Sequence, residues 1–271
     1  MRLINRTPGR PLGVALMLMP FVLVLAIYAI ASDIRRAENP RDKLLPAPAA
    51  IVETAGRLVS QPDKRSRRVL FWSDTAISLQ RLAIGVGLAA LIGLVVGLMI
   101  GLLPYMRALF AGFVSVLSMV PPLAILPILF IVFGLGETSK IALIAIGITP
   151  FLIRDLGQRV VEIPSEMMVK AQTLGASSLV IALRVALPQV MPRLIQAVRL
   201  SLGPAWLFLI AAEAIASESG LGYRIFLVRR YLAMDVILTY VVWITVLAFF
   251  IDYALKKLGE RAFPWFGRDG L

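Results

Sequence analysis

Residues 164–192 read PSEMMVKAQTLGASSLVIALRVALPQVMP, and they lie between two segments that are apolar enough to span a membrane. The stretch itself is too polar to cross a bilayer. Good helix formers fill residues 166–173, and apolar residues then recur at the three- and four-residue spacing of one helix face. Gly175 separates the two parts, and glycine adopts a left-handed backbone without steric cost. The sequence therefore predicts two short helices that meet at Gly175 and project from the membrane, the second with an apolar face of Leu179, Ala182, Leu183, Ala186 and Leu187.

The composition indicates an integral membrane protein. Of the 271 residues, 59% are hydrophobic and the mean hydropathy is +0.86, whereas soluble proteins contain about 45–50% apolar residues. Cysteine and histidine are both absent from the sequence, which excludes disulfides, thiolate nucleophiles, histidine bases and the common zinc sites. We therefore expect no catalytic residues, no bound metal or cofactor and no enzyme activity in this chain.

The apolar runs predict an all-α protein with about six spans in a single domain of residues 1–271. The first run could also be a secretory signal, because Ala29-Ile30-Ala31 resembles a cleavage site, but it is longer than a signal core. Residues 33–75 are polar and contain prolines, which favours a surface hairpin over a second domain. The predicted spans cover residues 12–32, 78–103, 109–134, 141–153, 194–217 and 236–251, with a loop at 154–193.

Small residues recur at every fourth position of the second predicted span. Such a stripe is flat and lets the backbone of another helix approach closely in lipid. We interpret it as a helix-packing surface rather than a ligand site, formed by Gly85, Ala89, Gly93, Gly97 and Gly101.

Prolines interrupt the third predicted span at Pro121, Pro122 and Pro127. Proline removes a backbone hydrogen bond and bends a helix, and this is tolerated where neighbouring groups or a cavity satisfy the freed carbonyls. A bent helix can line a pathway. Met119, Pro121 and Pro122 are therefore candidates for a translocation path.

Glu213 lies deep in the apolar fifth span, and Trp206 is seven residues before it on nearly the same helix face. A membrane-embedded carboxylate is costly unless it is paired, hydrated or facing a cavity. Both residues could line the path; alternatively, Glu213 sits near one end of the span and hydrogen-bonds neighbouring helices. Arg199 is fourteen residues from Glu213, which is about 21 Å along a helix and too far for a pair.

Two motifs carry a resemblance to a known family. The segment Lys170-Ala171-Gln172-Thr173-Leu174-Gly175-Ala176, followed by Val185-Ala186-Leu187-Pro188, resembles the cytoplasmic coupling loop of binding-protein-dependent ABC importer permeases. Residues 119–127 and 133–140 resemble the taurine/nitrate/sulfonate branch of that family. The glutamate of the family motif falls on Val169, and Lys170 replaces its first alanine. The coupling residues that the resemblance implies are Glu166, Lys170, Ala171, Leu174, Gly175, Ala176, Leu187 and Pro188.

The resemblance also implies an architecture and partners. It implies a type I importer permease fold with both termini cytoplasmic, in the bacterial cytoplasmic membrane. A second permease copy would complete the central path as a homodimer, with two ATPase subunits that hold ATP and Mg²⁺. A periplasmic or lipid-anchored binding protein would deliver a small polar solute such as a sulfonate, nitrate or taurine. This chain itself lacks the Gly-x-x-x-x-Gly-Lys-Ser/Thr phosphate loop.

Other features leave alternatives open. The net charge of +12 fits contact with anionic lipid rather than nucleic acid, because no basic stripe with interleaved aromatic residues is present. The lysines and arginines divide equally between the two sides of the predicted topology, so the positive-inside rule does not decide the orientation.

A secondary transporter without an ATPase partner is the main alternative function, although no internal repeat is apparent. An embedded enzyme or a channel lacks a recognisable site in this sequence.

Overall fold

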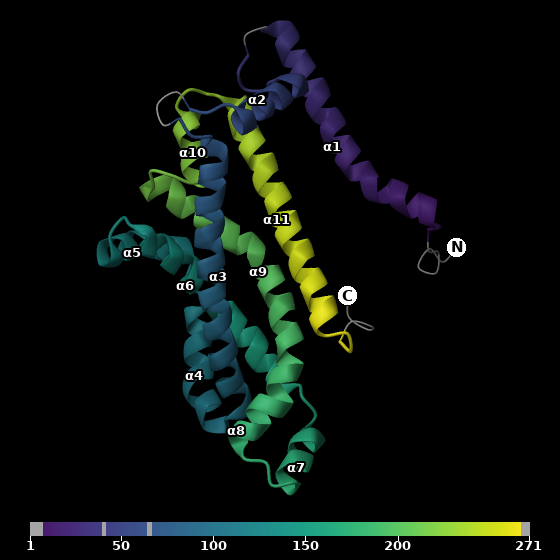
Figure 1. The fold of residues 1–271 in the computed structure, drawn as a ribbon, viewed down its shortest axis with the longest axis vertical. Helices are drawn as coiled ribbons and strands as arrows, with labels where there is room; N and C mark the ends of the chain where they lie inside the picture. Colours follow the sequence, from purple (N-terminus) through teal and green to yellow (C-terminus); the bar gives the residue numbers. More distant parts are fainter. Residues whose placement is uncertain (1–7, 40–41, 64–66, 267–271) are drawn as a thin grey trace.

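The computed structural model describes residues 8–39, 42–63 and 67–266, and within these ranges the chain is helical with turns and no strands. Arg2 and Arg6, which belong to the basic start of the sequence, lie outside the described residues. Figure 1 shows a tall bundle with α1 standing away from it. The elements are α1 (Arg10–Glu38), α2 (Pro48–Ser60), α3 (Leu70–Leu102), α4 (Pro104–Leu117), η2 (Pro122–Ile125), α5 (Leu126–Phe133), α6 (Glu137–Val161), α7 (Ser165–Thr173), α8 (Ser178–Ile181), η3 (Ala182–Ala186), α9 (Leu187–Ala216), α10 (Leu221–Arg229) and α11 (Met234–Ala262).

The prediction of an all-helical membrane protein is confirmed. Among the described residues, five helices are long and apolar enough to cross a membrane, or six if α4 and α5 count as one broken span. Most of them extend beyond the predicted bounds. For example, α6 covers Glu137–Val161 rather than 141–153, and α11 continues to Ala262 rather than 251. The backbone hydrogen bonds of a helix continue through polar residues, so apolar composition marks only the middle of each helix.

The long helices α3 and α6 run side by side in the same direction. Side chains of α6 fill the positions where α3 has only glycine, and an added Cβ at Gly93 would lie 2.7 Å from the Cβ of Leu152. No real Cβ atom tolerates so short a contact. The stripe on α3 therefore lies against α6, with Gly85 on Ile144, Gly93 on Leu152, Gly97 on Leu156 and Gly101 on Val160, while Ala89 is completely buried.

The third predicted span is broken rather than bent. The axes of α4 and of the η2–α5 segment meet at 83°. The break falls at Pro121-Pro122, where two successive residues have no backbone N–H to continue the helix. The last turn of α4 closes instead with short-range bonds, from Met119 N to Val116 O and from Val120 N to Leu117 O.

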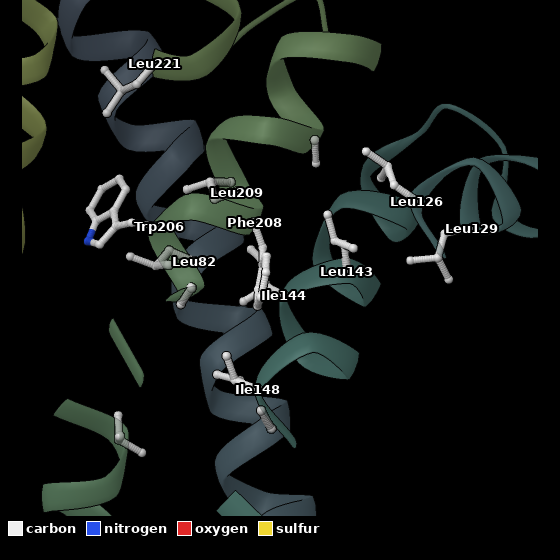
Figure 2. Packing of buried hydrophobic residues seen from close by; sticks show 14 of the residues in the cluster. Leu82, Leu126, Leu129, Leu143, Ile144, Ile148, Trp206, Phe208, Leu209 and Leu221 are labelled. Carbon is white, nitrogen blue, oxygen red and sulfur yellow. The ribbon is translucent and has the colours of Figure 1, made fainter. Parts of the chain in front are cut away.

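The main hydrophobic core lies between α3, α6 and α9. Figure 2 shows Leu82 of α3, Ile144 of α6 and Phe208 of α9 within this core, with Leu126 and Leu129 of α5 on its α6 side. Each of these side chains is buried. Three helices are thus held as one unit, to which α10 and α11 are added.

The two amino-terminal helices are attached differently from each other. The carboxyl-terminal part of α1 is hydrogen-bonded to the loop before α2. Tyr28 Oη donates to Pro46 O at 2.7 Å, and Ser32 Oγ donates to Leu45 O at 3.0 Å. In contrast, α2 packs on α11, where Thr54 Oγ1 donates to Asp235 Oδ2 at 2.7 Å. The rest of α1 makes no extended contact with another described helix.

Candidate functional site

The segment predicted to project from the membrane forms a hairpin at one end of the bundle. We call α7, the turn at Leu174–Ser177 and α8 the coupling hairpin; it lies at the end of the molecule opposite to α2 and α10 (Figure 1). Gly175 has a φ of +77°, as predicted from its place between two helices. Ala176 N donates to Ala171 O and Gly175 N donates to Gln172 O, which is the bonding pattern of a Schellman motif.

The outer surface of the coupling hairpin carries exposed apolar side chains. Leu174 at the tip is 88% exposed. Exposed apolar patches that are rimmed by polar residues are typical of protein or membrane interaction sites. The exposed side chains are Met167, Val169, Leu174, Leu179 and Val180 of the hairpin, together with Leu183 of the following η3.

The second part of the hairpin differs from the predicted separate short helix. From Ser178 the chain stays helical through α8, η3 and α9 up to Ala216. Pro188 has no N–H to donate, and the preceding η3 is a π-turn in which Leu187 N reaches back to Ala182 O. The π-turn therefore accommodates the proline, and residues 187–193 belong to a span. Within the predicted apolar face, Ala186 is buried whereas Leu179 and Leu183 are exposed.

The hairpin rests only loosely on the bundle. A cavity of about 390 Å³ separates the end of α3 from α7 and α8, and Met99, Leu102, Met168 and Ile181 are among the residues that line it. At the entry to the hairpin, the hydrogen bond from Arg159 holds the pKa of the Glu162 carboxyl below its usual range. The hairpin is thus joined to rigid helices at both ends without being packed tightly between them.

The predicted coupling residues are all placed on or beside this hairpin. Glu166 and Lys170 are exposed on α7, and neither forms an ion pair within the described part of the chain. Ala171 and Ala176 are half-buried in the Schellman turn, and Leu187 and Pro188 follow the π-turn.

Glu213 lies at the other end of the molecule in a buried polar network. Its carboxylate accepts hydrogen bonds from Ser78 Oγ at 2.7 Å, from Arg81 Nη1 at 2.7 Å and from Gly222 N at 2.8 Å. Arg81 also donates through Nε and Nη2 to both oxygens of Glu137, at 2.5 and 2.6 Å. The carboxylate of Glu213 is therefore paired and fully hydrogen-bonded, as burial in an apolar environment requires.

The same network caps the start of α10. The first N–H groups of a helix have no partner inside it. Here Gly220 N donates to Asp74 Oδ1 at 2.9 Å and Leu221 N donates to Ser78 Oγ at 2.9 Å, in addition to the bond from Gly222. Negative side chains are stabilised at a helix amino end by the helix dipole. An acid at position 213 thus fixes α10 onto α3 and α9.

The partners of Glu213 were not predicted from the sequence: Asp74, Ser78, Arg81 and Glu137 are not among the predicted site residues. A signal was present, since Asp74, Ser78, Arg81 and Gly85 recur at intervals of four, three and four residues and so share one face of α3. Arg199 makes a separate pair with Asp252 at 2.8 Å.

The candidates for the translocation path fall into two groups. Met119 is 74% exposed at the break between α4 and η2, beside exposed Pro121 and half-buried Pro122. In contrast, Trp206 and Glu213 are buried inside this single chain. The contacts of Glu213 favour the alternative structural role for it. The indole N–H of Trp206 has no hydrogen-bond partner among the described residues.

Comparison with known proteins accounts for this arrangement. The profile of the family described as "binding-protein-dependent transport system inner membrane component" matches residues 89–263. The chain belongs to this family. It is 36% identical over 196 residues to the taurine transport system permease protein TauC of Escherichia coli, which covers 72% of this chain and 71% of TauC. It is 32% identical over 211 residues to the nitrate import permease protein NrtB of Synechococcus elongatus, covering 76% and 75% of the two chains.

A solved structure agrees with the family. A chain of the inward-facing MetNI methionine ABC transporter superposes with a TM-score of 0.62 at 21% identity, covering 71% of this chain and 95% of that chain. The predicted type I importer permease fold is thereby confirmed. The matched family region starts at residue 89, so that α1 and α2 lie before it.

Proposed function

We propose that this chain is the membrane-spanning half of an ATP-driven importer for a small polar solute in the bacterial cytoplasmic membrane. Membership of the family supports transport, and relatives named for taurine, aliphatic sulfonates and nitrate support a solute of that size and polarity. ATP and Mg²⁺ would be held by two copies of a partner ATPase. A periplasmic or lipid-anchored binding protein would deliver the solute to the α2 end of the molecule.

The coupling hairpin is the observation that carries this proposal. It combines an exposed apolar tip with a cavity beneath it, and it joins α6 to α9. A groove on the ATPase would receive Leu174 and its apolar neighbours, while Glu166 and Lys170 would contact the rim. Closure of two ATPase subunits would then move the hairpin relative to the bundle.

A continuous helical run connects the coupling hairpin to the opposite end of the molecule. The helical run Ser178–Ala216 contains 39 residues, which corresponds to about 58 Å at 1.5 Å per residue. One end of this run is the coupling hairpin, and Glu213 near the other end holds α10. A tilt of α9 at the hairpin would therefore displace α10 and the α2 end, which is the requirement for alternating access.

The path itself would form between two copies of the chain. The exposed break at Met119-Val120-Pro121 interrupts a membrane-depth segment, and irregular backbone at that depth is tolerated where it lines a cavity or is covered by protein. We assign Met119, Pro121 and Pro122 to the wall of the path. Trp206 and Glu213 would support this wall from behind.

Co-purification from mild detergent tests the proposal. The tagged chain should bring an ATPase subunit with it, and Leu174→Asp should remove that subunit and its ATP hydrolysis while leaving the chain in the membrane. Val52→Asp is the matched control, because Val52 is also an exposed apolar residue but lies on α2 at the opposite end. Uptake in vesicles that proceeds without ATP and without an ATPase would favour a secondary transporter.

A further inference from the structure

We infer that the chain binds a phosphate group in a cavity between α3, α4 and α6, where the side chains of Arg107 and Arg154 hold it. The inference goes beyond the proposed function, because the phosphate group is a bound ligand rather than the transported solute. It requires only that the chain lies in a membrane, where phospholipid headgroups supply such groups.

The cavity lies at the same end of the bundle as the coupling hairpin. Its walls are formed by the last turn of α3, by α4 and by the second half of α6. Arg107 belongs to the first turn of α4, and Val161 is the last residue of α6. Figure 1 shows the lower ends of α3 and α4 close to α8 and far from α2. The cavity is therefore near a membrane surface, at the depth of lipid headgroups rather than in the middle of the bilayer.

The cavity is large enough for a phosphate group. Its volume is about 200 Å³, whereas a water molecule occupies about 30 Å³ in the liquid. Ser115 and Gln158 contribute neutral side chains that can donate hydrogen bonds. The remaining wall suits the apolar part of a phospholipid, since it consists of Ile100, Ala111, Val114, Ile153, Gly157 and Val161.

Arg107 and Arg154 give the cavity a positive charge that no acid balances. They are the ionisable side chains among the described residues that line it. Neither arginine forms an ion pair within the described part of the chain. The next two acids after Arg154 are Asp155 and Glu162, and both contact Arg159 instead. A charge in a membrane helix is costly unless it is paired, and a bound anion would supply the missing partner.

Neutral hydrogen-bond partners hold the two guanidinium groups in place. Arg107 Nε donates to Ile100 O at 3.1 Å and its Nη2 donates to Gly101 O, both at the carboxyl end of α3. Arg154 Nη1 donates to Ser118 Oγ at 2.9 Å. The carbonyls of a helix end carry only about half a negative charge, so the cavity stays positive. Because both side chains are already ordered, a ligand loses less affinity to ordering them.

Arginine and phosphate match in geometry as well as in charge. A planar guanidinium group can donate two parallel hydrogen bonds to phosphate oxygens. Basic pockets between membrane helices on the cytoplasmic side bind the headgroups of anionic lipids, and the proposed orientation puts the coupling hairpin and this cavity on that side. The phosphate group thus comes from an anionic phospholipid or from free inorganic phosphate, and an experiment can separate the two sources.

Binding to the purified transporter tests the site. The complex is prepared in mild detergent and phosphate-free buffer. Native mass spectrometry measures the binding of phosphatidylglycerol and of phosphatidylcholine, whose phosphate is balanced by its own cation, and calorimetry measures the binding of inorganic phosphate. Arg107→Gln combined with Arg154→Gln removes both cavity charges. Arg184→Gln combined with Arg261→Gln is the matched control, because these two arginines are exposed and do not line the cavity.

We expect phosphatidylglycerol to bind about tenfold more tightly than phosphatidylcholine, and the cavity variant to lose at least about that factor, because charge-assisted hydrogen bonds are removed. The control variant should bind phosphatidylglycerol like the unmodified transporter. Loss of inorganic phosphate binding in the cavity variant, with unchanged lipid binding, would assign the site to free phosphate. If neither ligand distinguishes the cavity variant from the control, the inference is overturned.

Arg154→Gln alone keeps the test decisive if the double variant fails to fold. The side chain of Arg154 is exposed, and glutamine retains a hydrogen-bond donor toward Ser118. We expect weaker phosphate binding at an unchanged melting temperature in phosphatidylcholine, and restored binding for Arg154→Lys. Undiminished binding in the folded glutamine variant would refute the site. ATP-driven uptake is measured separately, so absent binding with intact uptake contradicts this inference and not the proposed function.

Discussion

The carboxylate of Glu213 on α9 lies 2.7 Å from the guanidinium of Arg81 on α3, and the two side chains are 0% and 3% exposed. The pair joins helices that are far apart in the sequence and also anchors the start of α10 through Gly222. A buried ion pair of this kind is destabilising when one partner is removed, because the other charge remains without compensation.

Glu213→Gln should therefore reduce stability and transport together. Arg81 keeps its contact with Glu137. We therefore expect the free energy of unfolding to fall by about 3 kcal/mol, which is the lower end of the range for broken buried ion pairs. Thermal melting of the purified protein and uptake per folded molecule are measured in parallel. Unchanged melting with a collapse of uptake would instead indicate that Glu213 lines the path.

Arg199→Gln provides the contrast to this change. Arg199 and Asp252 are 20% and 43% exposed, and a partly exposed pair contributes only about 0–1 kcal/mol. We expect a melting temperature close to that of the unmodified protein. A decrease in melting temperature as large as that of Glu213→Gln would show that the two ion pairs contribute similarly to stability.

Gly93→Ala should weaken the contact of α3 with α6. The added methyl group would lie 2.7 Å from Leu152 Cβ, and overpacking of a tight contact costs about 1–3 kcal/mol. Gly112→Ala on α4 is the matched control, since nothing lies within 4 Å of a Cβ there. Melting curves in detergent should separate the two variants; equal curves would contradict the close approach of the helices.

Gly175→Val should disturb coupling without preventing insertion. A β-branched residue at a φ of +77° is strained, by about 1–3 kcal/mol, and the Schellman turn would open. Gly175→Asn is the control, because asparagine tolerates the left-handed region. The ratio of solute transported to ATP hydrolysed should fall for valine and be largely kept for asparagine. Normal coupling in the valine variant would refute the role of the turn.

Met119→Cys should react rapidly with a membrane-impermeant thiol reagent if the break lines an aqueous path. The position is 74% exposed, and the chain has no other thiol. Leu143→Cys, which replaces a fully buried side chain, should remain unlabelled. If both thiols are equally unreactive toward the reagent in the assembled transporter, position 119 is covered by protein or lipid rather than facing an aqueous path.

The sequence was most informative where a local rule determined the structure. The left-handed Gly175 and the interruption at Pro121 follow from the backbone properties of glycine and proline. The small residues of α3 also indicated a packing face. Their partner could not be predicted, because matching Gly93 with Leu152 depends on how two distant helices are set against each other.

Only part of the buried network around Glu213 could be predicted from the sequence. Glu213 is conspicuous in an apolar helix, but its partner Arg81 stands near the polar start of α3 and resembles a charge at a membrane boundary. The helix bounds were uncertain for a similar reason, since hydropathy does not report hydrogen bonds that continue beyond the apolar segment. The π-turn accommodates Pro188, but a proline in the sequence does not by itself show whether the helix ends, kinks or continues through such a turn.

The charges around Glu213 also bear on which solutes the molecule admits. The carboxylates of Asp74, Glu137 and Glu213 are matched by the cations of Arg81, Lys140 and Arg224, and each acid is in direct contact with one of these bases. The cluster is therefore electrically neutral as a whole, and at a distance its field falls off much faster than that of a lone carboxylate. An anion and a cation of the same size would meet nearly the same potential there. We therefore expect any charge selectivity to arise elsewhere, at the proposed wall of the path or in the proposed binding protein.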